Sequence, residues 1–191
     1  MKFVVVTGMS GAGKRTAMKM LEDVGFYCVD NLPAALISTF VELITLPKSE
    51  ITKVALGLDV RSDKSFLEIN KTLISMKESG LVYEVLFMDA SDEILIKRYK
   101  ESRRIHPIEG SSIEESIRSE REILKEIRRQ SDYVIDTSSL LTRELKEELD
   151  RIFIKNEAYN SLMVQIMSFG FKNGIPLEAD LVFDVRFLPN P

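Results

Sequence analysis

Tryptophan is absent from the 191-residue sequence, and cysteine and histidine occur only once each, as Cys28 and His106. One cysteine cannot form a disulfide within the chain, which favours a reducing cytoplasm. One cysteine and one histidine are also too few for a zinc site of the usual kind. A serine–histidine–aspartate triad would have to use His106. Disulfide-stapled proteins and structural zinc domains are therefore excluded.

Long apolar runs and a strong charge imbalance are also missing. No apolar run approaches the roughly 20 residues that span a bilayer, and the opening apolar stretch is too short for a signal peptide. The 26 basic and 30 acidic residues give a net charge of −4. This balance argues against a protein built mainly to coat DNA, although a local basic patch could bind RNA. The length and the 45% apolar content suit one compact domain.

The order of apolar runs predicts strands that alternate with helices. Residues 1–7 are predicted to form a strand, and its residues 3–6 are continuously apolar, as expected for a parallel strand that is covered on both faces. Such an alternation predicts an α/β fold with a mostly parallel sheet and helices on both faces, in a single domain over 1–191. Further strands are predicted at 26–29, 54–60, 82–88, 133–135, 162–169 and 181–185, and helices at 16–24, after Pro33, at 67–76, after Ser91, after Ser112 and at 142–154.

A glycine-rich turn with the pattern G-x-x-x-x-G-K runs from Gly8 to Lys14, between the first predicted strand and helix. In this context the pattern is that of a phosphate-binding P-loop. Successive backbone amides surround phosphate oxygens, and the following helix N-terminus adds positive potential. Lys14 can reach the β and γ phosphates as a point charge. The alternative is an ordinary glycine turn between a strand and a helix.

The position after the lysine departs from the pattern. It usually holds Ser or Thr, whose hydroxyl contacts Mg²⁺, but here it is Arg15, and Thr16 follows one residue late. One helical residue turns by about 100°, so Thr16 should point elsewhere. We therefore expect nucleotide binding to persist and Mg²⁺ placement to be inefficient.

Three acidic residues follow predicted strands, at the edge where ligands gather in an open parallel sheet: Asp30, Asp59 and Asp89. Asp59 and Asp89 resemble a Walker-B carboxylate that holds Mg²⁺ or its water. An ordinary helix cap or loop acid is the alternative for each. Arg61 lies two residues beyond Asp59, which suits nucleotide contact and equally suits a plain salt bridge.

The most basic local segment spans residues 97–107. Small phosphoryl-transfer enzymes use mobile lids whose arginines neutralise developing phosphate charge, so Arg103 and Arg104 are candidate catalytic residues of a kinase-like lid. The alternative is a solvated helix end that is favoured by the helix dipole. His106 precedes a proline and is expected at the surface, whereas Cys28 lies in an apolar run and is expected in the core.

Taken together, these motifs resemble the N-terminal P-loop domain of the RapZ/YvcJ family of bacterial nucleotide-binding proteins. The matching stretches are Gly8 to Lys14 and residues 21–33, 58–61, 98–99, 103–104, 106–107, 136–138, 168–172, 174–176 and 179–191. They follow one another in a single order along the whole chain, so the resemblance is specific.

The resemblance implies binding and slow hydrolysis of ATP and GTP, with Mg²⁺, in a regulatory role. Some family members act as RNase adapters, which bring a small regulatory RNA to an endoribonuclease through a C-terminal domain. We expect this chain to correspond to the N-terminal domain alone. Catalytic roles are expected for Lys14, Asp59, Arg103 and Arg104, and metal binding for Asp59 and Asp89. The resemblance implies binding of ATP by Gly8, Met9, Ser10, Gly11, Ala12, Gly13, Lys14 and Arg15, and of GTP by Asp59, Val60, Arg61 and Ser62. Thr16, the next residue of the predicted helix, is a further candidate for nucleotide binding.

Three functions remain open from the residues alone. The first is a weak ATPase and GTPase with a regulatory role. The second is a small-molecule kinase, in which Asp30 or Asp59 would act as the base near the γ-phosphate. The third is a nucleotide-sensing adapter that does not hydrolyse. The expected partners are nucleoside triphosphates and, through the C-terminal domain, RNA or an endoribonuclease, with no membrane; a homo-oligomer is left open.

Overall fold

The computed structural model describes residues 1–46, 49–59, 63–78, 80–102, 106–108, 110–154, 168–170, 172, 174–175 and 181–184. By its internal contacts the chain divides into two compact units, Met1–Ser161 and Leu162–Pro191. The sequence predicted one domain over 1–191, whereas this division separates the last 30 residues from the rest. All the helices and strands described below belong to the first unit.

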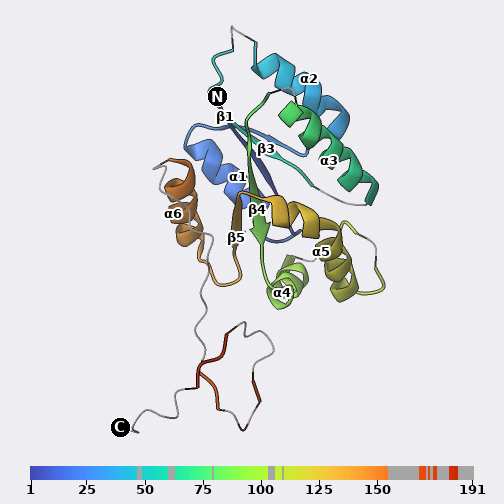
Figure 1. Ribbon diagram of the computed structural model, residues 1–191, viewed down its shortest axis with the longest axis vertical. Coiled ribbons are helices and arrows are strands. Elements are labelled where there is room, and N and C mark those ends of the chain that lie inside the picture. The colour runs from blue at the N-terminus through green and yellow to red at the C-terminus, as the bar shows by residue number, and fades with distance from the viewer. Residues whose placement is uncertain are drawn as a thin grey trace. The chain divides into compact units, whose positions relative to one another are not determined.

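A parallel sheet forms the centre of the first unit (Figure 1). In the described residues its strands are β1 (Lys2–Gly8), β2 (Tyr27–Asp30), β3 (Lys53–Gly57), β4 (Glu84–Asp89) and β5 (Tyr133–Asp136). Their spatial order is β2-β3-β1-β4-β5, and every neighbouring pair is parallel. The central strand β1 sets Val5 opposite Leu56 of β3 and Val85 of β4.

Helices connect these strands and lie on both faces of the sheet. They are α1 (Lys14–Asp23), α2 (Ala34–Ile44), α3 (Asp63–Glu78), α4 (Asp92–Ser102), α5 (Ile113–Gln130) and α6 (Thr142–Phe153). Helix α1 packs against α6 on one side, while α3 contacts both α2 and α5 on the other (Figure 1). The arrangement confirms the predicted α/β architecture.

The core is built around β1. Phe3, Val4, Val5 and Val6 are at most 1% exposed, because β3 and β4 flank the strand and helices cover both faces. A strand covered on both faces needs apolar side chains in both directions, so its sequence is continuous rather than alternating. The apolar run that predicted this strand is therefore a direct consequence of its central position.

Several element bounds differ from the prediction. Helix α3 begins at Asp63, four residues before the predicted start at Leu67, because its first three residues are polar and give no apolar signal. Strand β4 begins at Glu84 rather than Val82, whose side chain is 82% exposed.

The predicted late strands are only partly visible. Residues 168–169 and 181–184 are described and belong to no strand, and the remainder of both segments lies outside the described residues. Leu181 and Phe183 are 77% and 78% exposed.

The carboxyl edge of the sheet gathers the chemistry-bearing loops. After β3 the chain crosses to the other side of β1 to form β4, which makes β1 the point where the strand order reverses. Ligands of open parallel sheets bind at such a point. Strands β1, β2, β4 and β5 end there at Gly8, Asp30, Asp89 and Asp136, and Asp59 follows the end of β3.

Candidate nucleotide-binding site

The loop that joins β1 to α1 needs its glycines for two separate reasons. Gly8, Gly11 and Gly13 have φ angles of 126°, 90° and 99°, which side chains rarely adopt. In addition, a Cβ on Gly8 would lie 2.0 Å from the carbonyl oxygen of Met88, its neighbour on β4. The loop therefore leaves β1 in close contact with β4, and no residue with a side chain fits at Gly8.

Lys14 folds back over this loop. Its ammonium donates to the carbonyl oxygens of Gly8 at 2.7 Å and Met9 at 3.2 Å, and it lies 3.1 Å from Oδ1 of Asp59. The Lys14 side chain is 16% exposed and that of Asp59 is 31% exposed. The structure thus brings together two of the predicted site residues, which lie on the loops after β1 and β3.

The carbonyl oxygens of Gly11 and Ala12 face side chains of α4 and of the loop after β5. The Arg98 guanidinium of α4 donates to the carbonyl oxygen of Gly11 at 3.0 Å and to that of Thr137 at 2.8 Å. The buried Thr137 hydroxyl lies 2.9 Å from the carbonyl oxygen of Ala12 and 3.1 Å from that of Asp89. Its single proton can be donated to either of these two oxygens. The carbonyls of Gly8 and Met9 therefore face the ammonium of Lys14, and those of Gly11 and Ala12 face groups from other parts of the chain.

The amides of the loop behave differently from its carbonyls. Within the part of the chain that the structure describes, no acceptor receives a hydrogen bond from the amides of Gly11, Gly13, Lys14, Arg15 or Thr16. Gly13 is the left-handed N-cap of α1, so the last three are the orphan amides of a helix N-terminus. Consecutive unpaired amides of this kind form an anion-binding nest.

Three loop amides do have acceptors: those of Met9 and Ala12 donate to the carbonyl oxygens of Met88 and Met9, at 2.9 and 3.1 Å. The third, that of Ser10, has a side-chain partner that sequence reasoning missed. It donates to both oxygens of Glu120 on α5, at 3.1 and 3.0 Å, and the Ser10 hydroxyl donates to Oε1 at 2.6 Å. Glu120 is only 1% exposed. A signal was present in the sequence, since Glu120 lies three residues after Ile117 and four before Leu124, inside the apolar stripe of α5.

His106 is buried, so its expected surface position was wrong. It is 6% exposed, its ring lies 4.9 Å from that of Tyr99, and its Nε2 lies 3.3 Å from Oε2 of Glu120. The Nε2 contact is electrostatic rather than an aligned hydrogen bond. Its Nδ1 lies 3.1 Å from the amide nitrogen and 3.2 Å from the carbonyl oxygen of Ile108, so this ring atom has a backbone partner in either tautomer. The neighbouring proline suggested that His106 is exposed. Packing against Tyr99 and a backbone partner at Ile108 instead keep its ring buried.

Asp89 has a different environment from Asp59. Its two oxygens lie 2.9 Å from Arg121 Nη1 and 2.9 Å from Arg128 Nε of α5, and Oδ1 also accepts from the amide of Ala90. The carboxyl group is 5% exposed, and a metal ion bound there would compete with two guanidinium groups. The metal role of Asp89 stays a prediction, and these contacts favour a structural role.

The remaining predicted site residues fall into two groups. Arg15 and Thr16 are exposed in the first turn of α1, beside the unpaired amides. Asp30 is exposed at the end of β2. The others lie outside the described residues: Val60, Arg61, Ser62, Arg103 and Arg104.

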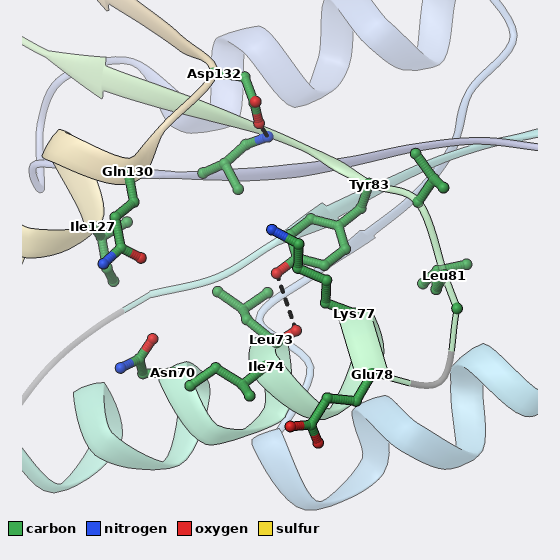
Figure 2. A pocket seen from close by; sticks show the side chains of 13 residues that line it. Asn70, Leu73, Ile74, Lys77, Glu78, Leu81, Tyr83, Ile127, Gln130 and Asp132 are labelled. Carbon is green, nitrogen blue, oxygen red and sulfur yellow. Dashed lines mark hydrogen bonds between the residues drawn. The ribbon is translucent and has the colours of Figure 1, made fainter.

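A cavity of about 800 Å³ lies at the opposite edge of the sheet, between α3, the start of β4 and the end of α5 (Figure 2). The Tyr83 hydroxyl at its wall donates to the carbonyl oxygen of Leu73 at 3.0 Å. Burial and the nearby charge of Asp132 raise the pKa of Tyr83 above its usual value. None of the predicted site residues lines this cavity. Its chemistry is therefore separate from the phosphate nest.

Solved structures share this fold at low sequence identity. A shikimate kinase from Acinetobacter baumannii, in complex with shikimate, matches with a TM-score of 0.51 at 15% identity, over 83% of this chain and 96% of its own. A fungal RNA kinase matches with a TM-score of 0.51 at 16% identity, over 81% of this chain and 44% of its own. The fold is therefore that of the P-loop kinases, a class with many different functions.

The family is shown by sequence. The RapZ-like N-terminal domain matches residues 1–157, and the RapZ C-terminal domain matches residues 162–191. Proteins described as nucleotide-binding from Agathobacter rectalis and Acetivibrio thermocellus are 55% and 53% identical over the whole of this chain. The chain belongs to the RapZ-like family of nucleotide-binding proteins, and it spans 66% of the length of these two relatives.

Two further findings bear on the class of protein. In the described part of the chain, no helix is both long and apolar enough to cross a membrane. The same residues contain no group of three or more His, Cys, Asp or Glu side chains arranged to hold a metal ion.

Proposed function

We propose that the chain binds ATP and GTP, with Mg²⁺, at the nest between β1 and α1, and that it hydrolyses both slowly in a regulatory role. The observation that carries the proposal is a difference in hydrogen bonding between the carbonyls and the amides of the loop. Carbonyls of the loop are held by Lys14, Arg98 and Thr137, whereas the amides of Gly11 and Gly13 and of the first turn of α1 have no acceptor among the described residues.

The residues present account for phosphate binding. Phosphate oxygens would accept from the unpaired amides at the N-terminus of α1, where the helix dipole adds positive potential. Lys14 lies above the same loop, and its contact with Asp59 is one that a phosphate oxygen could replace. Because the loop carbonyls already have donors, little rearrangement is needed before the nucleotide binds.

The residues also fit a bound magnesium ion of modest affinity. Mg²⁺ keeps several waters and takes one or two carboxylates together with substrate phosphates, and Asp59 is a half-exposed carboxylate beside Lys14. When bound, Mg²⁺ neutralises charge on the β and γ phosphates. Arg15 brings no hydroxyl to the position where this class usually has one. We therefore attribute slow hydrolysis to incomplete Mg²⁺ placement.

We further propose that the whole protein acts in the cytoplasm as an adapter that binds RNA or an endoribonuclease. The support is the match of residues 162–191 to the RapZ C-terminal domain, together with relatives longer than this chain. In the family this role belongs to the C-terminal domain. RNA binding by a longer homologous protein, compared with binding by this chain, would test the assignment.

The nucleotide site is tested by titration of the purified chain with ATP and GTP in the presence of Mg²⁺. Release of inorganic phosphate is followed in the same samples. Lys14→Ala should abolish binding, whereas Lys19→Ala, an exposed lysine on the same helix, should leave it unchanged. Absence of affinity for both nucleotides in the unaltered chain would refute the proposal.

A third arm separates hydrolysis from phosphoryl transfer. Labelled ATP is incubated with the chain and a pool of small metabolites. Free phosphate at a low rate supports the proposed hydrolase, label on a metabolite indicates a kinase, and saturable binding with neither indicates a nucleotide-sensing adapter. Signal that persists in Lys14→Ala identifies a contaminating enzyme.

A further inference from the structure

We propose that Glu120 is a positioning residue for the P-loop: it holds the Ser10 amide out of the phosphate nest and connects the loop to His106. This inference rests on the proposed nucleotide-binding function. It begins from an unusual feature of α5, an acidic side chain that is 1% exposed in the apolar stripe of the helix. Buried carboxylates are retained only where hydrogen bonds or charges compensate their loss of water.

The compensation for Glu120 comes mainly from the P-loop. Both carboxylate oxygens accept from the Ser10 amide, at 3.1 and 3.0 Å, and Oε1 accepts from the Ser10 hydroxyl at 2.6 Å. Ser10 and Glu120 are 110 positions apart in the sequence. The contact therefore joins two distant segments, and its geometry depends on the loop conformation.

This contact completes the set of restraints on the loop. The carbonyls of Gly8 and Met9 are held by Lys14, and that of Gly11 by Arg98. The Ser10 amide and the Met9 carbonyl belong to one peptide group, and Glu120 fixes its amide side. When Lys14 turns from the Met9 carbonyl to a phosphate, Glu120 would keep this peptide group from rotating its carbonyl toward the phosphates, which the carbonyl oxygen would repel. Holding this peptide preorganises the nest.

His106 lies beside the carboxylate of Glu120, with its Nε2 3.3 Å from Oε2. Its Nδ1 lies 3.1 Å from the amide nitrogen and 3.2 Å from the carbonyl oxygen of Ile108. Packing against Tyr99 keeps the imidazole there. His106 belongs to the basic segment at 97–107, so the P-loop and a residue of this segment contact the same buried carboxylate.

The first measurement is nucleotide affinity in a set of α5 variants. Glu120→Ala should weaken ATP binding by about tenfold, because a charged hydrogen-bond acceptor is lost from the loop. Glu120→Gln should restore most of the affinity, since its amide oxygen can accept from Ser10. Glu122→Ala removes an exposed glutamate from the same helix and should have no effect. Unchanged affinity in folded Glu120→Ala would overturn the proposal.

The second measurement does not use nucleotide. Hydrogen exchange of the Ser10 amide should be slow in the unaltered chain and fast in Glu120→Ala, while exchange in the strands stays slow. Ser10→Ala, which keeps the amide and deletes the hydroxyl, should remain slow and serves as a second variant where Glu120→Ala does not fold. Slow exchange combined with no nucleotide affinity in the unaltered chain would refute the proposed nucleotide binding and still support the contact between Glu120 and Ser10. Fast exchange at Ser10 in the unaltered chain would refute that contact.

Discussion

The ammonium of Lys14 lies 3.1 Å from Oδ1 of Asp59 while it donates to two carbonyl oxygens of its own loop. The carboxylate therefore lies where a phosphate oxygen would compete for the same cation. An ion pair that is 16% and 31% exposed on its two sides is partly screened by water, so exchange of one anion for another is not strongly opposed. Under the proposed function, Asp59 would take two roles: it would occupy the place of a phosphate oxygen before the nucleotide binds, and it would be a metal ligand afterwards.

Asp59→Asn separates these two roles. Without Mg²⁺, ATP should bind as tightly as before or up to about tenfold more tightly, because the competing negative charge is gone. With Mg²⁺, phosphate release should fall by about tenfold or more, because a carboxylate ligand is lost. Isothermal titration with and without Mg²⁺ gives the first result and a phosphate assay the second.

Asp23→Asn is the matched control for this experiment, since Asp23 is exposed at the far end of α1. It should change neither quantity. Weaker binding of ATP in Asp59→Asn without Mg²⁺ would show that Asp59 orients Lys14 rather than competing for it.

Arg15→Thr restores a hydroxyl at the position after Lys14. The residue is exposed in the first turn of α1, so the exchange should not disturb packing. We expect Mg²⁺-dependent hydrolysis to rise by about tenfold, because the new hydroxyl can contact the ion beside the β and γ phosphates. Initial rates of phosphate release over a range of Mg²⁺ concentrations provide the measurement.

The control for the hydroxyl is Arg15→Ala, which removes the guanidinium and adds no oxygen. If both variants are accelerated equally, the arginine itself slows the reaction and the hydroxyl is irrelevant. A rate for Arg15→Thr that stays equal to or below that of the unaltered chain would contradict the explanation for slow hydrolysis.

Gly8→Ala should be much more destabilising than substitution of another glycine with positive φ. A Cβ on Gly8 would lie 2.0 Å from the Met88 carbonyl oxygen, whereas one on Gly25 would meet nothing within 4 Å. Both residues have positive φ, at 126° and 90°. We expect Gly25→Ala to cost about 1–2 kcal/mol from backbone strain alone, and Gly8→Ala to cost about 3 kcal/mol or more. Equal midpoints in denaturant unfolding would show that the β1–β4 contact relaxes easily.

The sequence was sufficient for the sheet and the phosphate loop because both depend on local patterns. The buried run of β1 and the spacing of Gly8, Gly13 and Lys14 are each visible within a few residues. The partner of Ser10 was not predictable in this way, since Glu120 is 110 positions away and contacts the loop only when α5 packs. The surroundings of Asp89 also depend on distant parts of the chain. In the sequence this residue resembles a metal ligand, but in the structure it lies between two arginines of α5.

Local chemistry can also mislead in the other direction. The proline after His106 suggested an exposed loop, but burial of this ring depends on Tyr99 and Glu120 on two different helices. Tertiary contacts thus determined the environments of the titratable groups around the loop, while the local sequence determined the loop itself. Prediction from one sequence is accordingly strongest for motifs that a single segment completes.

The thiol of Cys28 should react slowly with alkylating reagents in the folded chain. Burial, followed by the charges of Glu22 and Asp30, raises the pKa of Cys28 from 9.0 to about 11, and its Sγ donates to the carbonyl oxygen of Met18 at 3.3 Å. The thiolate is the reactive form. At pH 8 the folded chain should therefore react about 100-fold more slowly than the denatured chain. A time course of iodoacetamide modification, followed by mass spectrometry, measures both rates.

The same pKa shift predicts the direction of alkaline destabilisation. Between pH 9 and about 11 the unfolded chain loses the Cys28 proton before the folded chain does, so the free energy of unfolding falls as the pH rises through this window. Burial and a hydrogen bond to Glu84 raise the pKa of Tyr133 from 10.0 to about 12, which extends the loss to higher pH. We expect Cys28→Ala to remove the fall in the free energy of unfolding that begins at pH 9 and to leave the fall at higher pH that belongs to Tyr133. A series of denaturant titrations at different pH values measures both. A decline that keeps its full size below pH 10 in Cys28→Ala would assign the loss to another group.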